Sequence, residues 1–292
     1  MSDRTFFILG RGKYKYMTIG EALKEEQNQL GLTHEEMAAG IIAKGTYSKL
    51  INGKIEIQSN LLIALLLEHD IDISNFFNKV KNTYTSKEKQ LAIELSQKMG
   101  LAVNNHDCVL AEDILEKILL LENHKYLKYR AIIATAYLEN KVSFLSENFK
   151  KEVLVAINSN SNWIKNPGAL RLLSTALVVL DPEQVENEME LFFLKLRRRN
   201  NYSESVKERY AMLCDNYLHW RFDYRKKVFD KKNIDSALQF LNDLDSSPHL
   251  MVYKLSKKYY QYLFNNQIDL AKKMKIDLLD MGCIAGVTNW PV

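Results

Sequence analysis

Residues 31–53 read Gly-Leu-Thr-His-Glu-Glu-Met-Ala-Ala-Gly-Ile-Ile-Ala-Lys-Gly-Thr-Tyr-Ser-Lys-Leu-Ile-Asn-Gly, and this stretch decides the fold of the 292-residue chain. Thr33 is suited to begin a helix, because two glutamates follow in its first turn, where carboxylates favour the positive end of the helix dipole. That helix ends at Gly40, and a second one spans about 43–51 before Asn-Gly stops it. Two short helices joined by a tight turn are typical of a helix-turn-helix motif.

Helices on either side of this pair complete a small domain. Upstream, Thr18 and Glu21 have the spacing of a capping box, and Gly31 is placed to end the helix that they begin. Downstream, a fourth helix covers about 59–69 and a fifth begins near Ser74. Five short helices predict a compact helix-turn-helix domain, although other small helical bundles have a similar pattern.

The chain then turns polar over 81–86, which we interpret as a linker. Thr85 and Glu88 form another capping-box pair, so we expect a helix over 87–99 that Gly100 ends. Further helices are expected at 107–122, 125–139, 144–158, 168–180, 183–199, 203–221, 233–244, 249–265 and 267–281. Because the breaks are short, neighbouring helices must form antiparallel hairpins, which predicts a tetratricopeptide-like repeat domain with a concave groove. A plain helical bundle is the alternative.

The composition fits an all-α fold in a reducing compartment. Only 11 Gly and 4 Pro occur, whereas all-β folds need a turn about every 8–12 residues. No secretory leader is recognised, and the densest apolar run, Leu61–Leu67, is far shorter than the roughly 20 residues of a membrane span. We therefore expect a cytoplasmic protein without membrane contact. Cys108, Cys214 and Cys283 have neither disulfide nor zinc spacing, so we expect them to be buried thiols.

Total charge does not by itself indicate a nucleic-acid partner. The formal net charge is only +4, and residues 1–80 hold nine Lys and Arg against ten Asp and Glu. A DNA-binding function must therefore depend on where individual charges lie, because the domain as a whole is not basic.

Several segments resemble one family of regulators. Residues 31–53 are similar to the helix-turn-helix of phage-repressor-type regulators. The Gly-Ile-Ile turn at 40–42 and the Thr-Tyr-Ser-Lys-Leu run at 46–50 resemble, more narrowly, the Rgg/MutR regulators of streptococci and lactobacilli. The Leu61–Leu67 helix, the Asp-Ile-Ser-Asn-Phe-Phe stretch at 72–77 and the long tyrosine-rich helical region after it resemble the same family. The resemblance covers essentially the whole chain.

This resemblance implies a homodimeric transcription regulator of the quorum-sensing type. A helix-turn-helix DNA-binding domain would occupy residues 1–80, a linker 81–86, and a helical-repeat domain for ligand sensing and dimerisation 87–292. The repeat domain would bind a short signalling peptide, usually a hydrophobic one. The dimer would bind a near-palindromic promoter site on double-stranded DNA, because operator symmetry mirrors protein symmetry.

The second helix of such a motif enters the major groove with its N-terminal residues on base edges. Lys49 and Lys54 would then reach phosphates, and Lys24 occupies a position where the family usually has an arginine that contacts the DNA backbone. The residues expected to face the groove are Lys44, Gly45, Thr46 and Tyr47. The complete set expected to bind DNA is Lys24, Thr33, His34, Lys44, Gly45, Thr46, Tyr47, Lys49, Asn52 and Lys54.

Four features depart from the family pattern. Ala43 replaces the usual Ser or Thr cap, a loss of about 1 kcal/mol, and Gly45 costs a helix about 1 kcal/mol relative to alanine. Ile51-Asn52 stands where the family has Glu-Arg, and Glu25-Glu26 follows Lys24 where the family tends to be basic. These features predict weak intrinsic DNA affinity, a site read partly through arms and dimerisation, or a vestigial DNA-binding domain.

Candidate peptide-binding residues lie in the repeat domain. Arg171 opens an apolar run, so it either caps a helix end or binds a carboxylate in a cavity. Asn216 is suited to pair with a peptide backbone, because an amide both donates and accepts. Tyr217 and Trp220 are suited either to stack on a peptide or to pack between helices. Basic runs within 195–199 and 225–232 are candidates for binding DNA or an acidic ligand, or are solvated helix ends.

No residue pattern indicates catalysis, a metal site or a cofactor. The six histidines are scattered without metal spacing, and the sequence has neither a phosphate-binding glycine loop nor a nucleophile elbow. Three classes of protein remain. A peptide-responsive transcription regulator is the interpretation that we favour. The others are a helical-repeat interaction scaffold with a weakened DNA-binding domain, and an enzyme acting on phosphorylated partners, which we do not expect.

Overall fold

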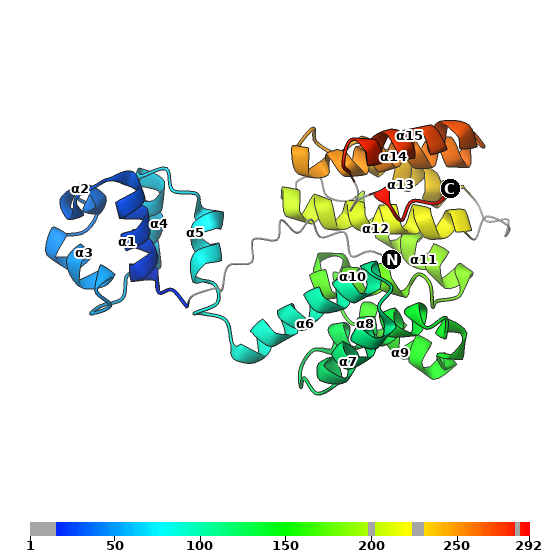
Figure 1. The fold of residues 1–292 in the computed structure, drawn as a ribbon, viewed down its shortest axis with the longest axis horizontal. Helices are drawn as coiled ribbons and strands as arrows, with labels where there is room; N and C mark the ends of the chain where they lie inside the picture. The colour runs from blue at the N-terminus through cyan, green and yellow to red at the C-terminus, as the bar shows by residue number, and fades with distance from the viewer. Residues whose placement is uncertain (1–15, 198–201, 224–230, 284–286) are drawn as a thin grey trace. The chain divides into compact units, whose positions relative to one another are not determined.

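A computed structural model of the chain describes residues 16–197, 202–223, 231–283 and 287–292. These residues form 15 α-helices and three short 3-10 helices, and they contain no strand (Figure 1). The predicted all-α fold is therefore confirmed. The chain divides into two compact units, with the boundary between Leu91 and Ala92.

The first unit contains the five helices that the sequence predicts. They are α1 (Ile19–Leu30), α2 (His34–Ala38), α3 (Lys44–Ile51), α4 (Ser59–Glu68) and α5 (Ile73–Val80). Each contributes apolar side chains to one core. Leu23, Tyr47, Leu65, Leu66 and Phe76 are fully buried there or beside it. Most of the stability of such short helices comes from this packing, because isolated helices of this length are marginal in water.

Side-chain caps fix where the first helices begin. The Thr18 side chain accepts a hydrogen bond from the backbone of Glu21, and the Glu21 carboxylate accepts one from the backbone of Thr18, which is the predicted capping box. Thr33 and Glu36 form a second capping box at the start of α2. Between α2 and α3 the backbone turns sharply, because Ala39 (φ 47°) and Gly40 (φ 69°) both adopt the left-handed conformation.

Helix α1 lies unusually close to helix α3. A Cβ atom on Gly20 would be 2.3 Å from the carbonyl oxygen of Leu50, a distance that real Cβ atoms do not adopt. Gly20 therefore permits the close packing of the two helices. This contact places α3 against the core and leaves its other face to the solvent.

The second unit begins within a helix that departs from its predicted limits. Helix α6 spans Lys87–Asn104 and continues through Gly100, which was expected to end it. Its start is capped by Ser86, whose Oγ accepts from the Lys89 amide at 3.3 Å. The predicted cap, Thr85, instead donates to the Lys81 carbonyl at 2.6 Å. Thr85 is thus committed to the preceding turn.

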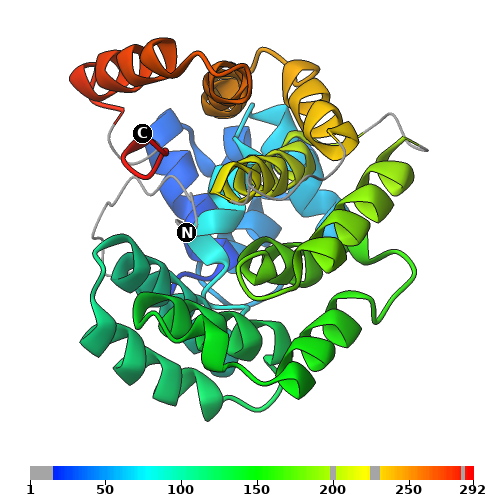
Figure 2. The same cartoon turned by 90° about the vertical axis from the view of Figure 1, so that its right-hand side faces the viewer.

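Nine further helices follow in chain order, as Figure 2 shows from the green helices to the orange and red ones. Helices α8, α10, α12 and α14 pack on one another in succession, and α11 packs on α13. This arrangement is a stack of hairpins with two layers, as the spacing of the segments predicts. The helices are α7 (Cys108–Leu119), α8 (Lys125–Leu138), α9 (Glu147–Ile157), α10 (Pro167–Ala176), α11 (Pro182–Leu196), α12 (Glu204–Asp223), α13 (Lys232–Asn242), α14 (Met251–Phe264) and α15 (Ile268–Asp280).

Among the described residues, no helix combines the length and the apolar character needed to cross a lipid bilayer.

Candidate functional site

Helix α3 has two distinct faces. Tyr47, Leu50 and Ile51 are buried in the core. The opposite face is exposed, and its residues are Lys44, Gly45, Thr46 and Lys49. The exposed face therefore carries two cations, a hydroxyl and a residue without a side chain, a combination suited to approach a nucleic acid.

Tyr47 does not face a groove, contrary to the sequence-based expectation. Its side chain is fully buried, and its hydroxyl donates to the carbonyl of Leu23 in α1 at 3.3 Å. The ring also lies 5.7 Å from the ring of His34. Burial raises the pKa of Tyr47 to about 12. Tyr47 thus anchors α3 to α1, because residues 47, 50 and 51 have the i, i+3, i+4 spacing of a core-facing stripe.

The ends of α3 are organised differently. Ala43 gives no side-chain hydrogen bond to the first turn, as its residue type predicts. There Lys44 Nζ lies 3.1 Å from Glu35 Oε2 of α2. At the C-terminal end, Asn52 Nδ2 donates to the carbonyl of Ser48 at 2.7 Å, so this amide supports the helix end.

The other expected DNA-binding residues lie around α3 in the same unit. Lys24 on α1 and Lys54 after α3 are exposed. Thr33 is the cap of α2, and His34 is half-buried behind it. Thr33 and Asn52 thus hold helix ends in place, whereas Lys24 and Lys54 are available to contact a phosphate.

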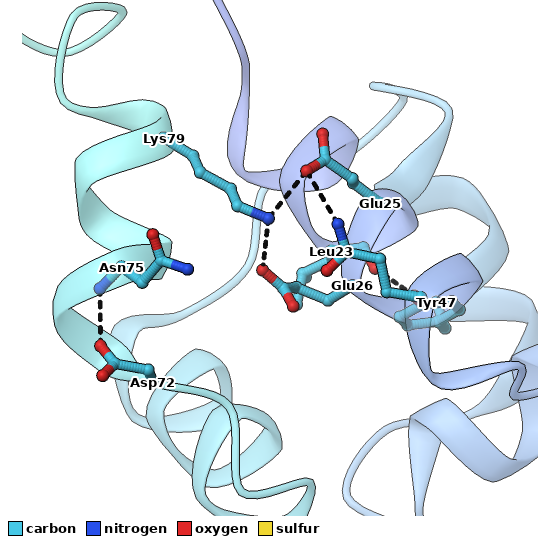
Figure 3. Close-up of polar contacts among 8 residues, drawn as sticks. Leu23, Glu25, Glu26, Tyr47, Asp72, Asn75 and Lys79 are labelled. Carbon is cyan, nitrogen blue, oxygen red and sulfur yellow. Dashed lines mark hydrogen bonds and ion pairs between the residues drawn. The ribbon is translucent and has the colours of Figure 1, made fainter. Parts of the chain in front are cut away.

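Figure 3 shows how the two glutamates beside Lys24 are oriented. Lys79 of α5 donates to Glu25 Oε1 at 2.8 Å and to Glu26 Oε1 at 2.7 Å. Glu26 is buried, with 8% of its surface exposed. Although burial opposes it, the hydrogen bonds and charges of the two carboxylates raise the pKa of Lys79. The two glutamates therefore share one ammonium group within the unit, which offsets one of their two negative charges.

A cavity of about 660 Å³, including its open mouth, lies in the second unit. Residues of α6, α8, α10 and α12 line it, so it lies on the layer formed by the first helix of each hairpin. Its lining residues are Ser96, Met99, Gly100, Val103, Leu127, Arg130, Ala131, Ile133, Ala134, Tyr137, Arg171, Ser174, Thr175, Val178 and Asn216. A mostly apolar wall with a few polar groups is typical of small-ligand sites.

The polar groups of this cavity form a connected set on α8, α10 and α12. Arg130 Nε donates to Thr175 Oγ1 at 3.3 Å, and Thr175 Oγ1 donates to the carbonyl of Arg171 at 2.9 Å. Asn216 Nδ2 donates to Ser174 Oγ at 2.6 Å. The described lining contains two arginines and no aspartate or glutamate. Arg130 and Arg171 are therefore the charged side chains of the described lining.

Two of the four expected peptide-binding residues line this cavity, namely Arg171 and Asn216. Tyr217 and Trp220 do not line it, because both are buried in the core, where their rings stack at 6.0 Å. The Tyr217 hydroxyl donates to Glu186 at 2.9 Å, and burial raises its pKa. The expectation that these two aromatic residues form a groove surface is thus corrected: they pack between helices.

The sequence analysis missed Arg130, although a signal for it was present. Arg130 precedes the apolar run Ala131–Ala134 in α8, just as Arg171 precedes an apolar run in α10. An arginine at the edge of an apolar helix face thus marks both arginines of the cavity lining.

Two lysines of the basic runs within 195–199 and 225–232 are held by contacts inside the repeat unit. Lys195 Nζ donates to the carbonyl of Ser161 at 2.6 Å, and Lys232 Nζ lies 2.5 Å from Glu190 Oε1. These contacts fit the interpretation as solvated helix ends. The central parts of both runs, within 198–201 and 224–230, lie outside the described residues.

The sequence matches no known protein-family model and no curated protein sequence. The fold, by contrast, matches several solved structures. A candidate transcriptional regulator from Listeria monocytogenes EGD-e superposes with a TM-score of 0.71 at 17% identity, over 93% of this chain and 94% of that one. The SHP pheromone receptor Rgg2 of Streptococcus dysgalactiae gives a TM-score of 0.64 at 16% identity, over 94% of this chain and 97% of that one.

A third similar structure is a bacterial peptide pheromone/receptor complex, with a TM-score of 0.61 at 14% identity over 90% of this chain and 92% of that one. In each case the similarity extends over both units. The chain thus has the fold of these regulators and receptors. The resemblance to the Rgg regulators that the sequence suggested is confirmed in the fold.

Proposed function

We propose that the protein is a DNA-binding transcription regulator of the Rgg type, controlled by a short peptide that binds in the cavity of the helical-repeat unit. The observation that carries the proposal is the division of α3 into a buried face and an exposed face with Lys44, Gly45, Thr46 and Lys49. In a helix-turn-helix, the exposed N-terminal part of this helix contacts base edges.

The charges around α3 support DNA binding. Glu25 and Glu26 are paired with Lys79, whereas Lys24, Lys49 and Lys54 are exposed and have no ion pair among the described residues. Such lysines are suited to contact phosphates, which position a protein on the duplex.

The cavity supports a peptide as the ligand. Its mostly apolar wall with a few polar groups fits an apolar segment of a ligand. Arg130 and Arg171 are suited to bind a carboxylate, which an acidic side chain or a peptide C-terminus supplies. Rgg2 is a pheromone receptor, and the third similar structure is a peptide pheromone/receptor complex. We carry that ligand class over to this chain.

The proposal includes a homodimer on a near-palindromic promoter site, because two copies of α3 would then read two half-sites. The peptide would act by binding one arrangement of the two DNA-binding units more tightly than another, since a ligand shifts an equilibrium only through such a difference. No enzymatic step is part of this function.

The test is genome-wide occupancy of the tagged protein beside a Lys44→Ala, Thr46→Ala, Lys49→Ala variant. Tyr47 is left intact because it belongs to the core. We expect a few sharp promoter sites that the variant loses, while a Lys87→Ala control keeps them. Absence of sites for the folded wild-type protein would overturn DNA reading and favour the alternative, a repeat-domain interaction scaffold.

A further inference from the structure

Glu35 and Lys44 form an exposed donor–acceptor pair at the start of α3. Lys44 Nζ lies 3.1 Å from Glu35 Oε2, and the two side chains are 63% and 76% exposed, in the order Lys44 and Glu35. The pair connects the first turn of α2 to the first residue of α3. Exposed ion pairs of this kind contribute little to folding. Its position therefore points to a role outside the fold.

Gly45, the next residue, supports a close approach from outside. Its backbone is helical, and a Cβ atom placed on it would meet nothing within 4 Å. Neither a left-handed conformation nor internal packing thus requires glycine here, although glycine is less favourable than alanine in a helix. The missing side chain instead leaves the backbone of α3 open at the residue after Lys44, so that another molecule has space to come near it.

We propose that Lys44 and Glu35 together recognise the orientation of a single base pair in the major groove, which distinguishes G·C from C·G. This inference rests on the proposed DNA-binding function and specifies its sequence preference. In a G·C pair, guanine O6 accepts and cytosine N4 donates. The two atoms are joined by a base-pairing N–H···O bond of about 2.9 Å. The 3.1 Å between Lys44 Nζ and Glu35 Oε2 matches that separation, with a donor facing the acceptor and an acceptor facing the donor.

The same geometry predicts an order of preference among the four base pairs. Lys44 requires a keto oxygen, and Glu35 requires an amino group, so G·C and T·A fit in one orientation. C·G and A·T place an amino group opposite the Lys44 ammonium and a keto oxygen opposite the Glu35 carboxylate. Donor then faces donor and acceptor faces acceptor, so these two base pairs are disfavoured. G·C exceeds T·A because guanine also offers N7 to the ammonium group.

The experiment is selection of bound duplexes from a random DNA pool, with the full-length protein and its variants. The deciding variant exchanges the two charges, Glu35→Lys with Lys44→Glu. We expect one position of each half-site to invert from G·C to C·G while the other positions stay the same. Glu35→Ala should relax that position, reducing discrimination against C·G by roughly tenfold or more. A Glu68→Lys, Lys81→Glu variant is the matched control, since both residues are exposed in the same unit.

The outcomes separate this inference from the proposed function. If the wild-type protein selects a motif and Glu35→Ala retains every preference in it, the pair reads no base and the inference is overturned. If the wild-type protein selects no motif, DNA reading itself is wrong and the inference is overturned with it. Should the charge-exchanged variant fail to bind, the Glu35→Ala selection decides.

Discussion

Lys79 Nζ lies 2.7 Å from Glu26 Oε1, and this ion pair connects the last helix of the first unit to its first helix. Glu25 shares the same ammonium group at 2.8 Å. The pair has little access to solvent, since the side chains of Lys79 and Glu26 are 18% and 11% exposed.

Lys79→Met should destabilise the first unit by about 1–3 kcal/mol, because it leaves a buried carboxylate without its partner. Hydrogen exchange of the α1 and α5 amides would measure the change, with Lys81→Met, an exposed neighbour, as the control. Since the folded pKa of Lys79 is raised, the stabilisation is present below pH 10.5 and is lost as the pH rises through the folded value. Equal protection in both variants would contradict the role of this pair.

Two glycines near α3 should respond in opposite ways to alanine. Gly45→Ala should keep or slightly increase the stability of the free protein, by at most about 1 kcal/mol, because alanine favours helix and meets no neighbour. It should nevertheless weaken binding to the selected operator. Gly20→Ala should destabilise the unit by about 2 kcal/mol, because its Cβ would overlap the Leu50 carbonyl. Urea unfolding beside fluorescence anisotropy with operator DNA separates the two effects, and unchanged operator affinity in Gly45→Ala would argue against close approach.

Glu188 in α11 should make stability depend on pH. It is 8% exposed; Asn158 Nδ2 donates to its Oε1 at 2.8 Å, and its buried Oε2 has no hydrogen-bond partner among the described residues. Burial raises the pKa of Glu188, although the Asn158 bond opposes the shift. The folded state therefore keeps the proton to a higher pH than the unfolded chain does, and stability falls as the pH rises from 4.5 through the folded value.

The variant Glu188→Gln should remove this loss and unfold at a higher urea concentration than the wild type at neutral pH. Tryptophan fluorescence is a suitable probe, because Trp163, Trp220 and Trp290 are all buried in the same unit. Glu183→Gln, at an exposed position on the same helix, should leave the pH dependence unchanged. A wild-type stability that rises from pH 4.5 to neutrality, with the same rise in the Glu188→Gln variant, would contradict the assignment.

The cavity should select peptides by their carboxylates. We expect a pool of synthetic apolar octapeptides with free C-termini to be retained in affinity selection, and Arg130→Ala and Arg171→Ala each to weaken retention at least about tenfold, the loss of one charge-assisted contact. Two further peptide pools, one with an amidated C-terminus and one with a single internal aspartate, show whether the C-terminus or an acidic side chain supplies the carboxylate. Arg197→Ala, an exposed arginine outside the cavity, is the control. If all variants retained the peptides equally, Arg130 and Arg171 would not belong to the peptide-binding site.

Much of the fold was predictable from local signals. The side chains of Thr18 and Glu21 each accept a hydrogen bond from the other residue's backbone N–H. Because this capping box needs no tertiary contact, the spacing of the two residues alone identifies the start of α1. Gly100 misled the prediction, because burial of Met99, Ala102 and Val103 on both sides of it outweighs the cost of a glycine inside α6. The cap of α6 was placed one residue early, since Thr85 and Ser86 have similar side chains and only the local turn decides between them.

The sites were less predictable than the fold. The register of the helix-turn-helix motif placed Tyr47 in the groove, whereas its spacing to Leu50 and Ile51 already indicated a buried stripe. In the repeat unit, Met99 and Asn216 line one cavity although more than a hundred residues separate them in the chain. Such proximity follows from the stacking of hairpins, which residue types alone do not encode.

The ion pairs around α3 have a consequence for the salt dependence of DNA binding. With Lys44 paired to Glu35 and Lys79 to Glu25 and Glu26, the lysines that remain to displace counterions in the described part of the motif are Lys24, Lys49 and Lys54. Each phosphate contact releases about 0.9 counterion, so one DNA-binding unit should release roughly three. The proposed dimer, with two such units, should therefore lose roughly a thousandfold in operator affinity between 50 and 200 mM salt, the decline expected for about six phosphate contacts.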